Sequence, residues 1–222
     1  MKHFLKIILL IASISLSFPA FALPPIPVVQ TPAGLQNPAS VAITGGTING
    51  PTTTISDYLF LSIDAGIDGG TAPTAAVVTS STNKAVTREF SGSANNDLFF
   101  VWQPPADWNG GTITFRVLGF VTNATAPANT ETAIFGLQGA SVADSQILSS
   151  ALGTVVNATF TANATYVQYD RWSTAWSAAV TLTGAAAGET VLLNLVRDTA
   201  DTYAQTIGVI GLEIKYTRSI VP

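Results

Sequence analysis

Short apolar segments alternate with turns rich in Gly, Pro and Asn from about residue 75 to the end of the chain. Within residues 112–118, apolar side chains at every second position alternate with Thr or Arg, which is typical of a half-buried strand. Residues 207–216 alternate in the same way and predict that Ile210 and Leu212 point inward. Similar segments predict strands at residues 58–63, 75–79, 85–90, 98–102, 133–138, 155–160, 178–182 and 191–196. The pattern therefore predicts an all-β fold, a jelly-roll-like β-sandwich of roughly eight strands.

Some predicted strands are apolar on both faces, notably residues 98–102 (LFFVW) and 191–196 (VLLNLV, in which only Asn194 is polar). The outer face of a monomeric antiparallel sandwich is normally polar. Loops or neighbouring subunits must therefore cover these outer faces. The chain also contains only 10% charged residues, against about 25% in an average soluble domain. Both features favour burial between subunits, and we expect a homo-oligomer, most simply a trimer.

The chain divides into three predicted segments. Residues 1–22 form a signal peptide, in which a charged start precedes the apolar run Phe4–Phe18 and the cleavage pattern Ala20-Phe21-Ala22. Residues 23–70 are rich in Pro and Gly and predict an extended stalk or linker with short strands, and residues 71–222 form the sandwich. We expect export to the cell surface or beyond it, with no membrane span after cleavage, because no later apolar run reaches about 18 residues.

Composition excludes several classes of function. The chain has no Cys, and its single His, His3, lies in the predicted signal peptide. The mature chain therefore lacks the residues behind most nucleophile–base pairs and zinc sites, and we predict neither an enzyme nor a cofactor or metal site. The whole chain has 9 basic and 13 acidic residues without any basic cluster. Nucleic acid is therefore not an expected partner.

Four aromatic residues gather between residues 166 and 176 (YVQYDRWSTAW), namely Tyr166, Tyr169, Trp172 and Trp176. Exposed rings would form a stacking platform for sugar rings. Buried rings would instead anchor the core or a subunit interface, which is the commoner fate of large aromatic side chains. Both alternatives stay open, and this segment is the strongest candidate for ligand binding.

A second candidate cluster, Arg197, Asp198 and Asp201, lies at the end of the predicted strand 191–196. An arginine flanked by carboxylates is typical of an ion pair that fixes a loop to the sandwich. A catalytic role would need a histidine or a second group of acids, and neither is present near it. We therefore interpret the three residues as a structural ion pair.

Two stretches resemble bacteriophage structural proteins. Residues 37–55 (NPASVAITGGTINGPTTTI) are similar to an "ITGG-x-ING" linker of tail-fibre-like and collar-like proteins. Residues 98–217 resemble jelly-roll-like virion domains, through WQPPADWNGG at 102–111, RDTADT at 197–202 and GVIGLEIKYT at 208–217. The resemblance implies a virion-associated trimeric fibre, knob or appendage without catalytic residues.

The sequence therefore supports two functional hypotheses. The first is a non-enzymatic phage- or prophage-type structural protein that binds a host-surface receptor as a trimer. The alternative is a secreted bacterial adhesin or carbohydrate-binding β-sandwich module, which accounts better for a signal peptide. Both hypotheses expect a surface glycan or receptor as the partner.

Overall fold

A computed structural model describes residues 53–148 and 151–220, all within the compact unit Ile48–Pro222. The predicted signal peptide, residues 23–52 of the predicted stalk and the whole ITGG-x-ING motif at 43–50 lie outside the described residues. The described elements are strands apart from one short 3-10 helix. In chain order they are β1 (Thr53–Ser62), η2 (Ile63–Ala65), β2 (Ile67–Asp68), β3 (Thr74–Ser80), β4 (Asn83–Phe90), β5 (Asp97–Trp102), β6 (Thr114–Phe120), β7 (Thr132–Val142), β8 (Val156–Thr161), β9 (Arg171–Ser173), β10 (Thr190–Asp198) and β11 (Ile207–Ile220).

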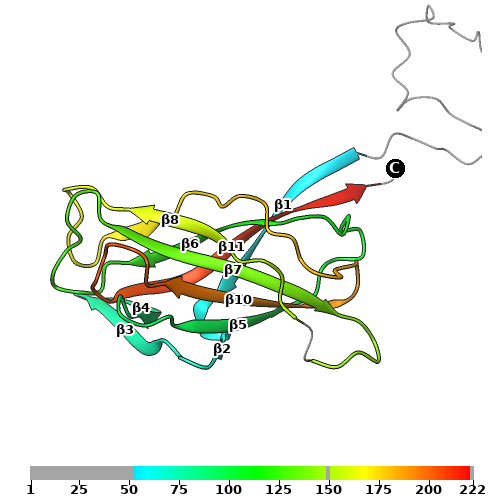
Figure 1. The fold of residues 1–222 in the computed structure, drawn as a ribbon. Coiled ribbons are helices and arrows are strands. Elements are labelled where there is room, and N and C mark those ends of the chain that lie inside the picture. Colours follow the sequence, from blue (N-terminus) through cyan, green and yellow to red (C-terminus); the bar gives the residue numbers. More distant parts are fainter. Residues whose placement is uncertain (1–52, 149–150, 221–222) are drawn as a thin grey trace, which may run out of the picture. The chain divides into compact units, whose positions relative to one another are not determined.

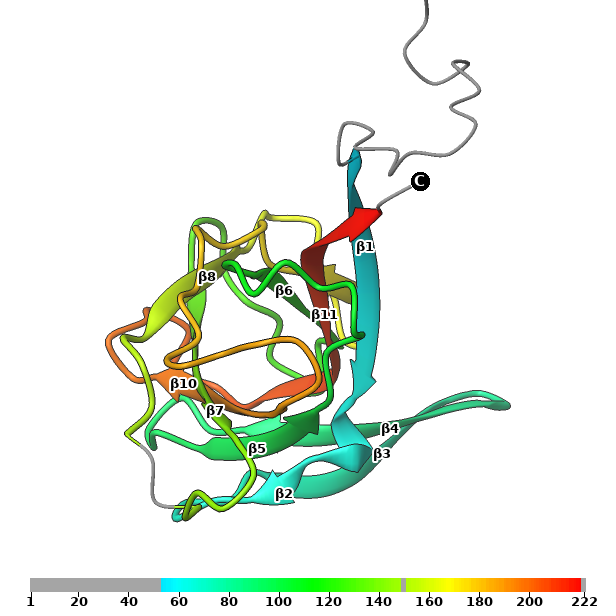
Figure 2. The same cartoon turned by 90° about the vertical axis from the view of Figure 1, so that its right-hand side faces the viewer.

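The strands form two antiparallel sheets that face each other as a sandwich (Figures 1 and 2). Sheet A has the order β3-β4-β11-β6-β9, with β1 also paired to β11, and sheet B has the order β2-β5-β10-β7-β8. From β4 to β11, every connection except that between β7 and β8 crosses from one sheet to the other. This alternation over eight strands is the jelly-roll arrangement. The predicted fold class is therefore confirmed.

The core lies between the sheets because alternate residues of each strand point inward. Phe115 and Val117 of β6 are fully buried, whereas Arg116 between them lies on the outer face and is only partly buried. β11 departs from simple alternation. A bulge between Val209 and Gly211 shifts its register, so Val209 and Leu212 are both fully buried. The predicted inward position of Ile210 is therefore wrong, because an inserted residue reverses the alternation beyond it.

Residues 53–68 of the predicted stalk contribute to both sheets. All ten residues of β1 pair with β11, and β2 pairs with β5. Leu59 and Leu61 alternate toward the core and pack against it, which gives β1 a reason to stay on the sheet. β1 and the C-terminal part of β11 run side by side away from the sandwich (Figures 1 and 2). β11 is the only described strand that pairs with β1.

The doubly apolar strands leave part of their outer surface exposed. Val101 of β5 points outward and is 53% exposed, and Val77 and Val86 on the β3–β4 hairpin are 59% and 49% exposed. The trimer stays a prediction.

Residues 53–148 and 151–220 include no helix of the length and hydrophobicity that a membrane span requires.

Candidate functional site

The aromatic residues predicted as one cluster are divided between the core and the surface. Trp172 on β9 is buried, and its ring stacks on Phe135 with 5.6 Å between centroids and 13° between planes. Tyr166 packs edge-on against Phe160, at 5.2 Å between centroids. The Trp172 ring also lies against Gly119 of the neighbouring strand β6, where a Cβ atom would come within 2.5 Å of Trp172 Cζ2. Trp172 is therefore a core residue, and Tyr166 is partly buried against the core.

Tyr169 lies apart from this core cluster. Its backbone has a φ of +74°, in the left-handed region, and its amide donates a hydrogen bond of 2.7 Å to the carbonyl of Val121. The side chain is 39% exposed and lines a surface hollow with Lys84 of β4 and Phe120 of β6. No aromatic pair joins it to the other three predicted residues within the described part of the chain. Tyr169 is therefore a separate surface residue.

Trp176 is the member of the predicted cluster that lies on the outer face of sheet A. Its ring is 5.9 Å from that of Tyr58 on β1, and the guanidinium carbon of Arg116 on β6 lies 4.9 Å from its centroid. Side chains along β1 alternate, so Phe60 shares the outer face with Tyr58. Tyr58, Phe60 and Trp176 are 54%, 53% and 37% exposed. These three side chains are called the aromatic patch below.

Neighbouring residues hold the rings of the aromatic patch in place. Arg116 forms an ion pair with Glu213 of β11, with 2.5 Å between Nε and Oε2, and this contact fixes the guanidinium near Trp176. Phe60 is paired with Glu213 in the register, and its ring lies over Gly211, where a Cβ atom would come within 2.2 Å of Phe60 Cζ. A side chain at 211 would therefore displace the ring. Gly211 and the ion pair therefore hold the rings of Phe60 and Trp176 in place on the outer face of sheet A.

The arrangement offers a surface for binding. Exposed ring faces lie beside the Arg116–Glu213 ion pair, and Lys215 is the register partner of Tyr58. Such a surface can stack on an apolar ligand face and exchange hydrogen bonds with polar groups at its rim. Among the described residues, no group of three or more His, Cys, Asp or Glu side chains is placed to hold a metal ion. No His–nucleophile pair occurs there either, since His3 lies outside these residues.

The predicted ion-pair cluster divides between two faces of β10. Arg197 points into the core and pairs with Asp201, at 2.9 Å between Nε and Oδ2, and both side chains are almost completely buried. Arg197 also donates hydrogen bonds to the carbonyls of Phe90, Gln205 and Tyr203. Asp198 is the next residue on the strand and therefore lies on the outer face, where it accepts from the amide of Ala200. The buried pair consists of Arg197 and Asp201 alone.

Tyr203 shares this buried environment. Its ring lies 5.9 Å from the guanidinium carbon of Arg197, and its hydroxyl donates a hydrogen bond of 3.2 Å to the carbonyl of Thr125. Burial raises the pKa of the Tyr203 phenol above its usual value, and the nearby positive charge of Arg197 opposes part of that rise. Asp201, Arg197 and Tyr203 thus fix the loop between β10 and β11 to the end of the sandwich.

Sequence reasoning missed Tyr58 and Phe60, because both fall in the segment assigned to the stalk. The run of Tyr58, Leu59, Phe60 and Leu61 has strand character, but all four residues are apolar, so the sequence did not show which face would be exposed. Nothing in the local sequence indicated that these residues pair with β11 and therefore lie close to Trp176.

No family model and no curated protein matches the chain. Among solved structures, the chain is similar to the CBM36-1 domain of a multidomain xylanase from the hindgut metagenome of Trinervitermes trinervoides, at 12% identity and a TM-score of 0.37, over 72% of this chain and 96% of that domain. It is also similar to CBM35 from Cellvibrio japonicus Abf62, at 8% identity and a TM-score of 0.36, over 73% and 97%.

A third similar structure is Xyl-CBM35 in complex with a disaccharide containing glucuronic acid, at 9% identity and a TM-score of 0.38, over 74% and 99%. These identities and TM-scores are low, so they assign neither a family nor a function. The jelly-roll topology rests on the strand order of the two sheets.

Proposed function

We propose that this protein is an exported, non-enzymatic carbohydrate-binding β-sandwich module that holds its ligand on the aromatic patch. The observation that carries the proposal is the set of three exposed rings on the outer face of sheet A, with Tyr58 and Phe60 each more than half exposed. Large apolar patches on soluble proteins usually mark sites of interaction. Predicted export would bring this surface to glycans outside the cell.

A saccharide fits the chemistry of the patch. A pyranose ring has an apolar face of C–H groups and an edge of hydroxyl groups. The faces of Tyr58, Phe60 and Trp176 suit the apolar side, because aromatic rings provide a broad contact area with little loss of conformational entropy. The Arg116–Glu213 ion pair and Lys215 provide charged donors and acceptors for the hydroxyl edge. Binding alone, without bond cleavage, is what this set of side chains can perform.

The test measures glycan binding by the chain without its predicted signal peptide. Trp176→Ala and Tyr58→Ala should each weaken binding to any glycan retained on an array by about tenfold or more, because aromatic anchors carry most of the binding energy of such surfaces. Tyr169→Ala is the matched control, because Tyr169 is about as exposed as Trp176, at 39% against 37%, and lies apart from the patch. Full binding by both patch variants would refute the patch as the binding surface.

A phage- or prophage-type trimeric fibre or knob is the second candidate, and a specific observation favours it. β11 is the only described strand that pairs with β1, which leaves an edge able to pair with another chain. Tyr58 and Phe60 on that strand would add apolar contact area between subunits. Size-exclusion chromatography with light scattering separates the candidates. A stable trimer would support the fibre or knob, and a monomer at micromolar concentration would exclude it.

A further inference from the structure

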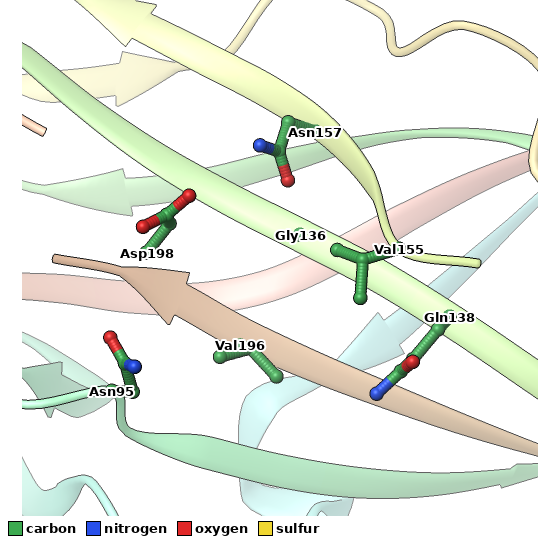
Figure 3. Close-up of a pocket in the computed structure, with 7 residues that line it drawn as sticks. All are labelled: Asn95, Gly136, Gln138, Val155, Asn157, Val196 and Asp198. Carbon is green, nitrogen blue, oxygen red and sulfur yellow. The ribbon is translucent and has the colours of Figure 1, made fainter. Parts of the chain in front are cut away.

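We propose that the outer face of sheet B carries a second binding site, a polar groove that takes a neutral saccharide. The groove has a volume of about 420 Å³, within the usual range of about 300–1,000 Å³ for ligand sites. Asn95, Gln138, Asn157 and Asp198 provide its polar groups, and Gly136 and Val196 form its apolar part. Figure 3 shows Gly136 and Gln138 on β7, Asn157 on β8, and Val196 and Asp198 on β10, with Asn95 on the chain just before β5. The site belongs to the sheet opposite the aromatic patch and does not depend on it.

Gly136 makes room for two of the side chains that line the groove. It lies on β7, with Asn157 of β8 and Val196 of β10 as its register partners. A Cβ atom at this position would lie 2.4 Å from Val155 Cγ1 and 2.9 Å from Asn157 Oδ1. Any larger residue would therefore push Val155 and Asn157 away from β7 and change the shape of the groove.

The side chains of Asn95 and Asp198 are each held by a backbone amide, and each keeps one donor or acceptor group free. Asn95 Oδ1 accepts a hydrogen bond of 3.1 Å from the amide of Thr199, which leaves its NH₂ group available. Asp198 Oδ1 accepts one of 2.9 Å from the amide of Ala200, which leaves Oδ2 as an acceptor. These two backbone contacts reduce the conformational entropy that both side chains would lose on binding.

The other two polar groups, on Gln138 and Asn157, make no side-chain hydrogen bond to the described residues, so both amides keep their full capacity. The neighbouring Asn194 carries a further polar atom without a partner. It lies opposite Gln138 in the register, is 3% exposed, and its Oδ1 has no hydrogen-bond partner among the described residues. Buried polar atoms are nearly always paired, so an unpaired acceptor beside the groove points to a missing donor.

The chemistry of these groups selects the class of ligand. The amides of Gln138 and Asn157, which both donate and accept, the free NH₂ group of Asn95 and one carboxylate oxygen match the paired donors and acceptors of adjacent sugar hydroxyls. No Lys or Arg lines the groove, and Asp198 would repel an anion. Phosphate, sulfate and uronate ligands are thereby disfavoured. The groove also lies on a sheet face, whereas an extended peptide is usually recognised at a sheet edge.

The experiment follows the side-chain amide signals of the ¹⁵N-labelled full mature chain by NMR. The probes are neutral hexaoses built from glucose, mannose, galactose or xylose, and a hexauronate serves as the anionic counterpart. At least one neutral hexaose should shift the NH₂ signals of Gln138 and Asn157, and the hexauronate should not. The double variant Gln138→Ala/Asn157→Ala should weaken this binding at least tenfold, which corresponds to about 1.4 kcal/mol.

Two results would overturn the groove site. One is the absence of any shift of these amide signals with every neutral hexaose, and the other is undiminished binding by the double variant. The variant Trp176→Ala distinguishes this site from the proposed function. Binding that is lost with Trp176→Ala and kept by the double variant would overturn the groove alone. The opposite result would overturn the aromatic patch and support the groove.

Discussion

The buried pair of Arg197 and Asp201 supports a quantitative prediction for the variant Asp201→Asn. The carboxylate accepts from Arg197 Nε at 2.9 Å and Nη2 at 3.3 Å, and from the amide of Ile134 at 3.3 Å. Asparagine keeps the shape but removes the negative charge and turns one acceptor into a donor that faces other donors. The Arg197 guanidinium would then stay buried at 0% exposure without its counter-charge.

Removing one partner of a buried ion pair costs about 3–5 kcal/mol of unfolding free energy. For a chain of this size each kcal/mol shifts the melting temperature by about 2–4 °C, so the expected loss is about 6–20 °C. The matched control is Glu213→Gln, which breaks the Arg116–Glu213 pair. The side chains of Arg116 and Glu213 are 33% and 22% exposed. Water therefore screens their attraction, and the loss of unfolding free energy is limited to about 1 kcal/mol.

Urea denaturation followed by circular dichroism measures both free energies, and calorimetry gives the melting temperatures. A loss for Asp201→Asn no larger than that for Glu213→Gln would refute the argument. A further variant, Arg197→Met/Asp201→Leu, removes both charges at once. It should recover only part of the stability, because it removes the uncompensated charge but leaves the carbonyls of Phe90, Gln205 and Tyr203 without the Arg197 donor.

Three further predictions follow from the core and its titrating groups. Trp172→Ala should lose about 3–5 kcal/mol of stability and Trp176→Ala about 1 kcal/mol or less, and equal losses in urea denaturation would contradict their different burial. Gly119→Ala should lose about 1–3 kcal/mol, because its Cβ would lie 2.0 Å from the Gly208 carbonyl oxygen, and an unchanged melting temperature would contradict this contact. The pKa of the Tyr203 phenol is raised in the folded protein, so the phenol ionises first in the unfolded chain. The resulting contribution to stability is complete below about pH 10 and is lost as the pH rises through the folded-state pKa. Urea midpoints should therefore fall more steeply above about pH 10 in the wild type than in Tyr203→Phe, and parallel curves would contradict the shift.

Part of the candidate site was within reach of sequence reasoning. The aromatic segment between residues 166 and 176 drew attention to Trp176, and its composition left both core and surface positions open, with the core or an interface as the commoner fate of such residues. Burial of Trp172 depends on Gly119 of the neighbouring strand, which makes room for the indole. Exposure of Trp176 depends on a position beyond the end of β9, where the chain runs along the edge of β6 and the amides of Thr174 and Ser177 donate to the carbonyls of Val117 and Phe115. Neither partner lies near these residues in the sequence.

The sequence by itself determined the all-β class, the strands whose alternation is undisturbed, and the absence of histidine and cysteine chemistry after residue 3. These properties depend on side-chain type and on a spacing of two residues, and both are local. Only the tertiary structure decided that β1 pairs with β11 and brings Tyr58 close to Trp176, and that Arg197 and Asp198 face opposite sides of β10. Strand partners and register are set by long-range packing of whole faces, so a surface assembled from several strands has no signal in any one of them.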